Sequence, residues 1–220
     1  MASGTSRRER AESTCQRLIA TARRHWQERG YEAASIGGIL AEVGLARGGF
    51  YHHFADKRAL FEAVRDQVEA EVLSWMRGAS NSPGGPWSEL RAACVLHVSA
   101  CADPGVQRIL LRDGPALLER GVEPRRAALQ ARLERALPDD PAGTAALAPL
   151  LLGALEAAAL ELADQPDADG WRQLHTSVTL LLEGLRLVSL QGMVPAVPKS
   201  AEEDRAWQTW QRRGASTPRS

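Results

Sequence analysis

The sequence has few cysteines, few aromatic residues and no long uncharged apolar run. Three cysteines in 220 residues cannot form the disulfide framework of a small secreted domain. The sequence opens MASGTSRRER, with no apolar run behind a basic segment, so we predict no secretory signal and expect a cytoplasmic location. Pro149, Gly153, Glu156 and Glu161 interrupt the most apolar stretch, 145–163, and we therefore predict no membrane span.

An excess of charge of either sign is also absent, because Lys and Arg together number 27, as do Asp and Glu. The charge is nevertheless distributed unevenly. Residues 1–59 hold ten basic and six acidic side chains, whereas residues 60–198 hold twelve basic and eighteen acidic ones. A basic N-terminal module on an acidic body is expected when one end of a chain meets an anion such as DNA.

Apolar positions recur at helical spacing throughout, and β-branched residues are scarce, so we predict an all-α fold of about nine helices. The first helix is expected over 10–29, with Gly30 as its stop. Short helices follow from Ser35 to Val43 and over 46–54. A long amphipathic helix begins near Asp56.

The last two predicted helices indicate a dimer. Residues 145–163 are apolar nearly all round, which implies burial on more than one side. The final helix, from Asp169, places apolar residues at alternating intervals of three and four, the pattern of a helix-bundle seam. We predict a homodimer whose interface contains Leu151, Leu155, Leu174, Val178, Leu181 and Leu185.

Residues 35–57 have the spacing of a helix-turn-helix, with Gly44 at the turn. The exposed side of the second helix carries hydrogen-bond donors and glycines instead of carboxylates, which would repel phosphate. Arg47 near the helix start can form two hydrogen bonds to guanine in a major groove, while Tyr51, His52 and Lys57 can donate to backbone oxygens. His53, next to Phe54, has a second interpretation as a hydrogen-bonded histidine without DNA contact.

The stretch GLARGGFYHHFADKRALF, with the helix from Ser35 before it, closely resembles the motif of the TetR/AcrR family of bacterial transcriptional regulators. The resemblance implies an all-helical homodimer with an N-terminal three-helix DNA-binding domain and a C-terminal domain for ligand binding and dimerisation. It implies DNA contacts at Ser35, Arg47, Gly48, Gly49, Tyr51, His52, His53 and Lys57. Two departures stand out: Gly37 and Gly38 lie inside a short helix, and Ala46 replaces the usual Ser or Thr cap.

We therefore divide the chain into three parts: a DNA-binding domain over 1–59, an effector-binding and dimerisation domain over 60–198, and a disordered tail over 199–220. Arg7, Arg8 and Arg10 form a flexible basic arm that either reaches DNA or is simply solvated. The expected function is that of a repressor released from a palindromic operator by a small molecule. The alternative is a DNA-binding regulator without such an effector, either constitutive, partner-controlled or activating.

The effector is expected to be largely apolar, in a pocket that includes Trp75, Trp87, Cys94, His97, Leu110 and Trp171. Cys94, His97 and Cys101 share one helix face but lack a fourth ligand, so we interpret them as core residues and predict no metal and no cofactor. A redox role for the two cysteines stays open. No nucleophile motif and no glycine-rich nucleotide loop is present, so we do not expect an enzyme.

Overall fold

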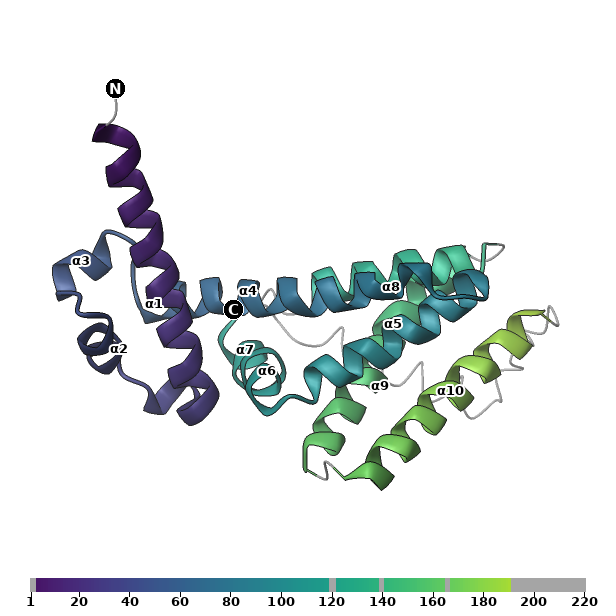
Figure 1. Cartoon of the computed structure of the whole chain (residues 1–220). Coiled ribbons are helices and arrows are strands. Elements are labelled where there is room, and N and C mark those ends of the chain that lie inside the picture. Colours follow the sequence, from purple (N-terminus) through teal and green to yellow (C-terminus); the bar gives the residue numbers. More distant parts are fainter. Residues whose placement is uncertain (1–2, 119–121, 139–140, 165–166, 191–220) are drawn as a thin grey trace, which may run out of the picture. The chain divides into compact units, whose positions relative to one another are not determined.

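The computed structural model describes residues 3–118, 122–138, 141–164 and 167–190, and within these ranges every regular element is a helix (Figure 1). The all-helical fold is thus confirmed. The predicted tail over 199–220 lies outside the described residues. The helices are α1 (Ser3–Ala33), α2 (Ile36–Val43), α3 (Arg47–Tyr51), α4 (Lys57–Arg77), a 3-10 turn η1 (Gly78–Asn81), α5 (Gly85–Cys101), α6 (Pro104–Gln107), a π-helix η2 (Arg108–Asp113), α7 (Gly114–Leu117), α8 (Glu123–Ala136), α9 (Pro141–Asp164) and α10 (Ala168–Leu190).

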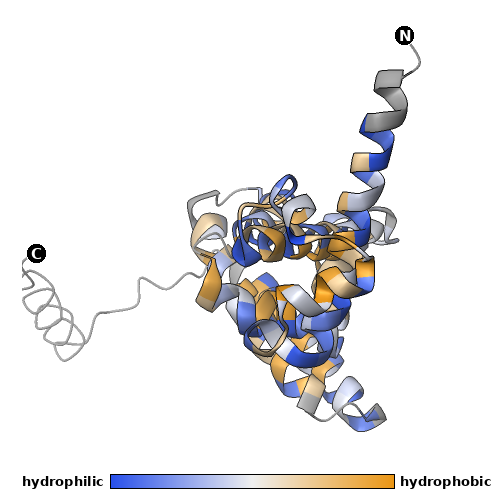
Figure 2. Ribbon diagram, turned by 90° about the vertical axis from the view of Figure 1, so that its left-hand side faces the viewer, coloured by the Kyte–Doolittle hydropathy of each residue, from blue (hydrophilic) through white to orange (hydrophobic). Residues whose placement is uncertain are grey.

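Helix α1 begins earlier than its sequence pattern predicts. It starts at Ser3, so the backbone of the predicted basic arm is part of this helix. Residues 8–13 of this helix are exposed and mostly polar, and Figure 2 shows mainly hydrophilic colours in the first coloured part of the helix. The predicted stop at Gly30 is visible as a break, because Gly30 has φ 79° and ψ 168° in the midst of helical residues. Only glycine adopts such angles without strain.

Helix α4 joins the group of α1, α2 and α3 to the remaining helices of the compact unit that ends at Leu180 (Figure 1). Its N-terminus is capped by Asp56, whose carboxylate accepts a hydrogen bond from the backbone N–H of Ala59 at 2.7 Å. The buried face packs against α1, α5 and α8. That face consists of Leu60, Phe61, Val64, Arg65, Val68, Glu69, Val72 and Met76.

Helices α5, α8 and α9 pack against one another and form the second part of the core. Figure 2 shows hydrophobic and hydrophilic colours mixed over the helical body. The segment Gly143–Ala163 of α9 is long and apolar enough to cross a membrane by length and composition. Of the most apolar window, 33% is buried, and Ala148, Leu152 and Ala159 lie in this core.

The predicted dimer residues do not all face outward. Leu151, Leu155 and Val178 are each less than 5% exposed within a single chain, so they belong to the core of their own subunit and the predicted interface is corrected there. The reason is that apolar helical spacing does not distinguish a neighbouring helix from a second copy. Large apolar side chains that are exposed on α9 and α10 are Leu150, Trp171, Leu180, Leu181 and Leu187.

Candidate nucleic-acid interface

Helix α2 is fixed to α1 by polar contacts at its C-terminal end. Arg17 donates from Nη2 to the carbonyl oxygen of Val43 at 2.8 Å, which satisfies an unpaired C-terminal carbonyl of α2. His25 Nε2 lies 2.9 Å from Oε2 of Glu42, and Arg24 forms an ion pair with the same carboxylate. Hydrogen bonds from His25 and Arg24 lower the pKa of Glu42 and keep this carboxylate charged. The helix-turn-helix therefore has a defined orientation on α1.

The turn between α2 and α3 forms as its sequence predicts. Gly44 takes a left-handed conformation, with φ 72°. Ser35 caps α2 by accepting the backbone N–H of Gly38 at 3.1 Å, and a Cβ at Gly38 would lie 3.2 Å from the Ser35 hydroxyl. The glycine in this short helix thus leaves room for the cap. Ala46 starts α3 without a side-chain hydrogen bond, as the departure from the family pattern implies.

The short helix α3 is anchored on one side and open on the other. Phe50 is 1% exposed and contacts the rings of Tyr51 and Phe54. Arg47 is exposed, and Tyr51 is 62% exposed. This face therefore presents a guanidinium and a phenol to solvent at the position where a recognition helix meets base edges.

The remaining predicted contact residues differ in their surroundings. His52 is exposed, whereas His53 is half-buried. Gly48 has open space where a Cβ would be, but a Cβ at Gly49 would lie 2.7 Å from Cδ1 of Leu45. Packing against the turn therefore accounts for Gly49 without any DNA contact.

Lys57, the first residue of α4, is half-buried, and its Nζ lies 4.3 Å from the centroid of the Tyr31 ring. Such a cation–π contact holds the ammonium group on one side and leaves N–H donors available on the other. This partner for Lys57 was not foreseen from the sequence, because the two residues are 26 positions apart.

The predicted effector-pocket residues do not share one cavity. Trp75 is 56% exposed, while Cys94, His97 and Leu110 are buried. Burial raises the pKa of the Cys94 thiol to about 12, which disfavours the thiolate form. Among the described residues, no group of three His, Cys, Asp or Glu side chains is placed to hold a metal ion.

An apolar groove of about 420 Å³ lies between α5 and α10. Trp171 is a residue of the predicted pocket that does line it. Ser99, Arg172 and His175 give the groove a small number of polar groups. The other lining residues are Val95, Val98, Leu174, Thr176 and Val178.

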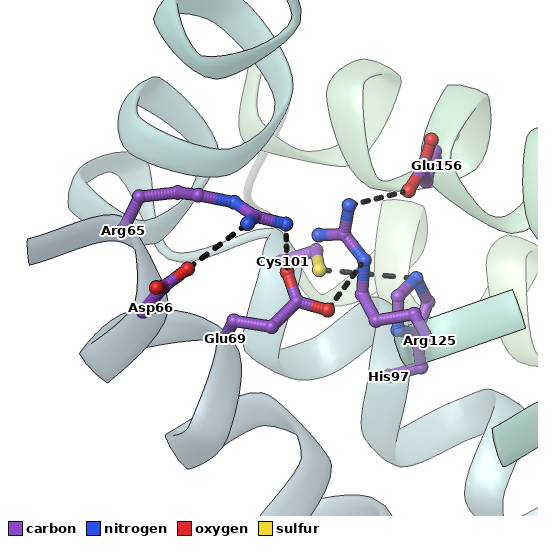
Figure 3. Close-up of polar contacts among 7 residues, drawn as sticks. All are labelled: Arg65, Asp66, Glu69, His97, Cys101, Arg125 and Glu156. Carbon is purple, nitrogen blue, oxygen red and sulfur yellow. Dashed lines mark hydrogen bonds and ion pairs between the residues drawn. The ribbon is translucent and has the colours of Figure 1, made fainter. Parts of the chain in front are cut away.

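A buried charge network, which the sequence analysis missed, lies where α4, α8 and α9 meet (Figure 3). Arg125 is fully buried, with its Nε 3.5 Å from Glu69 and its Nη2 3.2 Å from Glu156. Glu69 also accepts a hydrogen bond from Arg65 at 3.2 Å. Burial raises the pKa of both Glu69 and Glu156, and Arg125 opposes that shift. Nothing in the local sequence around Arg125 distinguishes it from a surface arginine.

Comparison with known proteins agrees with this geometry. Residues 18–64 match the model of bacterial regulatory proteins of the tetR family, and residues 87–185 match that of the tetracyclin repressor-like C-terminal domain. A solved TetR-family transcriptional regulator from Pectobacterium atrosepticum is 33% identical, with a TM-score of 0.65 over 81% of this chain and 96% of that one. A transcriptional regulator from Pseudomonas aeruginosa PAO1, 24% identical, shares the fold with a TM-score of 0.67 over 82% and 94% of the two chains.

Relatives with curated descriptions match over part of the chain. The transcriptional repressor AcnR of Corynebacterium diphtheriae is 30% identical over 120 residues, which is 54% of this chain and 62% of that protein. The transcriptional regulator AcrR of Shigella flexneri is 27% identical over 105 residues, 47% of this chain and 49% of that protein. The chain thus spans about half the length of the curated relatives it matches.

A helix-turn-helix on a helical C-terminal domain defines a DNA-binding transcriptional regulator. The chain belongs to the TetR family of such regulators, whose members are not enzymes. The predicted family and class of protein are therefore confirmed.

Proposed function

We propose that this protein is a cytoplasmic repressor that binds a palindromic operator as a homodimer, with each α3 in a major groove. The observation that supports this most directly is the exposed face of α3, which offers donors from Arg47 and Tyr51 and no carboxylate. Half-sites about one helical turn apart, or slightly more, would match a two-fold dimer. The proposed DNA contacts are Ser35, Arg47, Gly48, Tyr51, His52, His53 and Lys57, with Gly49 supporting the turn.

Replacing Arg47 by alanine is expected to weaken operator binding by about 1–3 kcal/mol and to relax the preference at one base position. The reason is the loss of a two-bond contact to a base edge. Fluorescence anisotropy with labelled duplexes from the region upstream of the gene, and with single-base variants, measures both effects. Arg77→Ala, at the exposed far end of α4, is the control. Wild-type binding of every duplex by Arg47→Ala would contradict the proposed orientation of α3.

The dimer is proposed to form through the exposed apolar residues of α9 and α10. Leu150 and Leu180 are 71% and 68% exposed in the single chain, which is unusual for large apolar side chains that stay in water. We expect Leu150→Asp combined with Leu180→Asp to give monomers in sedimentation velocity experiments, because each subunit would bring two carboxylates into the interface, where they would be desolvated. Ala127→Asp, on an exposed position of α8, serves as control. A dimer that persists in the double variant would place the interface elsewhere.

The effector is proposed to be a largely apolar small molecule that binds in the groove between α5 and α10. A volume of about 420 Å³ lies within the range of ligand pockets, and Trp171 offers a flat apolar surface. To release DNA, the molecule must bind the arrangement that does not fit the operator more tightly than the one that does. Operator binding must then weaken the affinity for the effector by the same factor.

A further inference from the structure

The break in α1 places a contact between the DNA-binding helices and the C-terminal part of the chain. After Gly30, the backbone N–H of Tyr31 donates to Oδ2 of Asp113, the last residue of η2, at 2.8 Å. A Cβ on Gly30 would lie 3.0 Å from the guanidinium of Arg108, in the same π-helix. The φ of 79° at Gly30 requires glycine at the break, and the Asp113 carboxylate fixes the backbone just after it.

The side chain of Tyr31 connects this backbone contact to the start of α4. Its ring packs against the rings of Trp26 and Phe61, at centroid distances of 5.9 and 5.0 Å. Lys57 Nζ lies 4.3 Å from the centroid of the Tyr31 ring. Asp113 and Lys57 are thus connected through one residue, from its backbone N–H to the face of its ring.

The segment that carries Asp113 is itself tied to α9. Gln107 donates from Nε2 to the carbonyl oxygen of Ala159 at 3.2 Å, and its Oε1 accepts from Nε of Arg112 at 2.8 Å. Asp113 follows Arg112 directly in the π-helix. Such helices are rare and frequently occur at functional sites. A shift of α9 or η2 would therefore move the carboxylate that holds Tyr31.

We propose that Asp113 and Tyr31 are positioning residues for the phosphate contact of Lys57, and that they link the C-terminal part of the chain to operator affinity. The inference rests on the proposed function, because it takes Lys57 to be a DNA contact. A free lysine side chain loses much rotamer freedom when it binds a phosphate. Because the Tyr31 ring already holds the ammonium group in place before DNA binds, less side-chain entropy is lost when Lys57 contacts the phosphate.

The test compares DNA binding by variants of the full-length dimer at two salt concentrations. The probes are a labelled duplex from the region upstream of the gene and a labelled duplex of arbitrary sequence, since a phosphate contact acts on both. Tyr31→Leu is expected to weaken binding to both duplexes about two- to fivefold, the range that an exposed cation–π contact corresponds to. Tyr31→Phe keeps the ring and is expected to bind like wild type.

Asp113→Ala is expected to weaken binding to both duplexes, as Tyr31→Leu does. Asp113→Asn retains an accepting oxygen and is the matched control. Lys57→Ala should lower the salt dependence by about one counterion. In the Lys57→Ala background, neither Tyr31→Leu nor Asp113→Ala should weaken binding further. Thermal unfolding and sedimentation of each variant separate loss of fold from loss of contact.

Two outcomes overturn the inference while leaving DNA recognition intact. One is a loss caused by Tyr31→Leu or Asp113→Ala that persists in full when Lys57 is already alanine, which indicates a general structural role. The other is wild-type binding by both variants. A third result, in which Lys57→Ala itself leaves affinity and salt dependence unchanged, refutes the DNA contact of Lys57 in the proposed function and the inference with it.

Discussion

Replacing Arg125 by alanine is expected to lower the free energy of unfolding by about 3–5 kcal/mol. The arginine is fully buried, within 3.5 Å of Glu69 and 3.2 Å of Glu156. Its removal leaves carboxylates in an environment whose desolvation already raises the pKa of both. The expected loss is large because it includes the penalty for uncompensated buried charge as well as the lost attraction.

Denaturant unfolding followed by circular dichroism measures this loss. Arg126→Ala is the matched control, because Arg126 is the next residue of α8, is partly exposed and pairs with Glu123 at the surface. Such a surface pair contributes about 0–1 kcal/mol. Equal destabilisation by the two substitutions would contradict the proposed importance of the buried network.

A third variant separates charge from packing at the same position. Arg125→Met combined with Glu69→Gln and Glu156→Gln replaces three of the ionised groups with neutral side chains of similar size, while Arg65 keeps its ion pair with Asp66. Its stability is expected to recover most of the loss seen in Arg125→Ala, because neutral groups carry no charge to desolvate. A triple variant as unstable as Arg125→Ala would show that shape, not charge compensation, governs this site.

The parts of the fold that the sequence predicted are those determined by neighbouring residues. Ser35 caps α2 three positions away, and Gly44 supplies the left-handed turn that follows. Phe50 is the buried residue of the five-residue helix α3, and its ring packs near that of Phe54. These features need only local spacing and conformational preference, which is why the helix-turn-helix could be located from the sequence.

Contacts between distant segments were not predictable in this way. The all-round apolar pattern of α9 predicts burial on more than one side, but only 33% of its most apolar window is buried in the single chain. Leu151 and Leu155, predicted at the dimer interface, are buried within their own chain. Likewise, no feature of the sequence predicts that Arg125 pairs with Glu69. The two residues belong to different helices, and the packing of those helices determines the contact. The link from Asp113 to Tyr31 spans 82 positions and depends on the π-helix.

Acidification is expected to destabilise the protein through His97. Burial, with a smaller contribution from Arg125, lowers the pKa of His97 from 6.5 to about 3. Between these values the unfolded chain binds a proton that the folded protein does not. The stabilising contribution is therefore fully present above the unfolded pKa and is lost as the pH falls toward the folded one. The free energy of unfolding should decrease by about 1.4 kcal/mol per pH unit in this window, or about 2–3 kcal/mol over two units.

The carboxylates of Glu69 and Glu156 also titrate at low pH, but in the opposite sense. Burial raises their pKa in the folded protein, so folding favours their protonated forms as the pH falls. The contribution of His97 must therefore be measured as the difference between wild type and His97→Leu, in denaturant unfolding at about pH 7.5 and about pH 5. His52→Ala, which removes an exposed histidine, is the control.

The expected result is that wild type is more sensitive to acid than His97→Leu. Leucine loses the weak contact of Nε2 with the Cys101 sulfur, which lies 3.8 Å away, but it requires no partner for Nδ1, which has none in the described structure. The variant is thus expected to differ from wild type chiefly in its pH dependence. If the free energies of unfolding of wild type and His97→Leu differed by the same amount at both pH values, His97 would be protonated to the same extent in the folded and unfolded states.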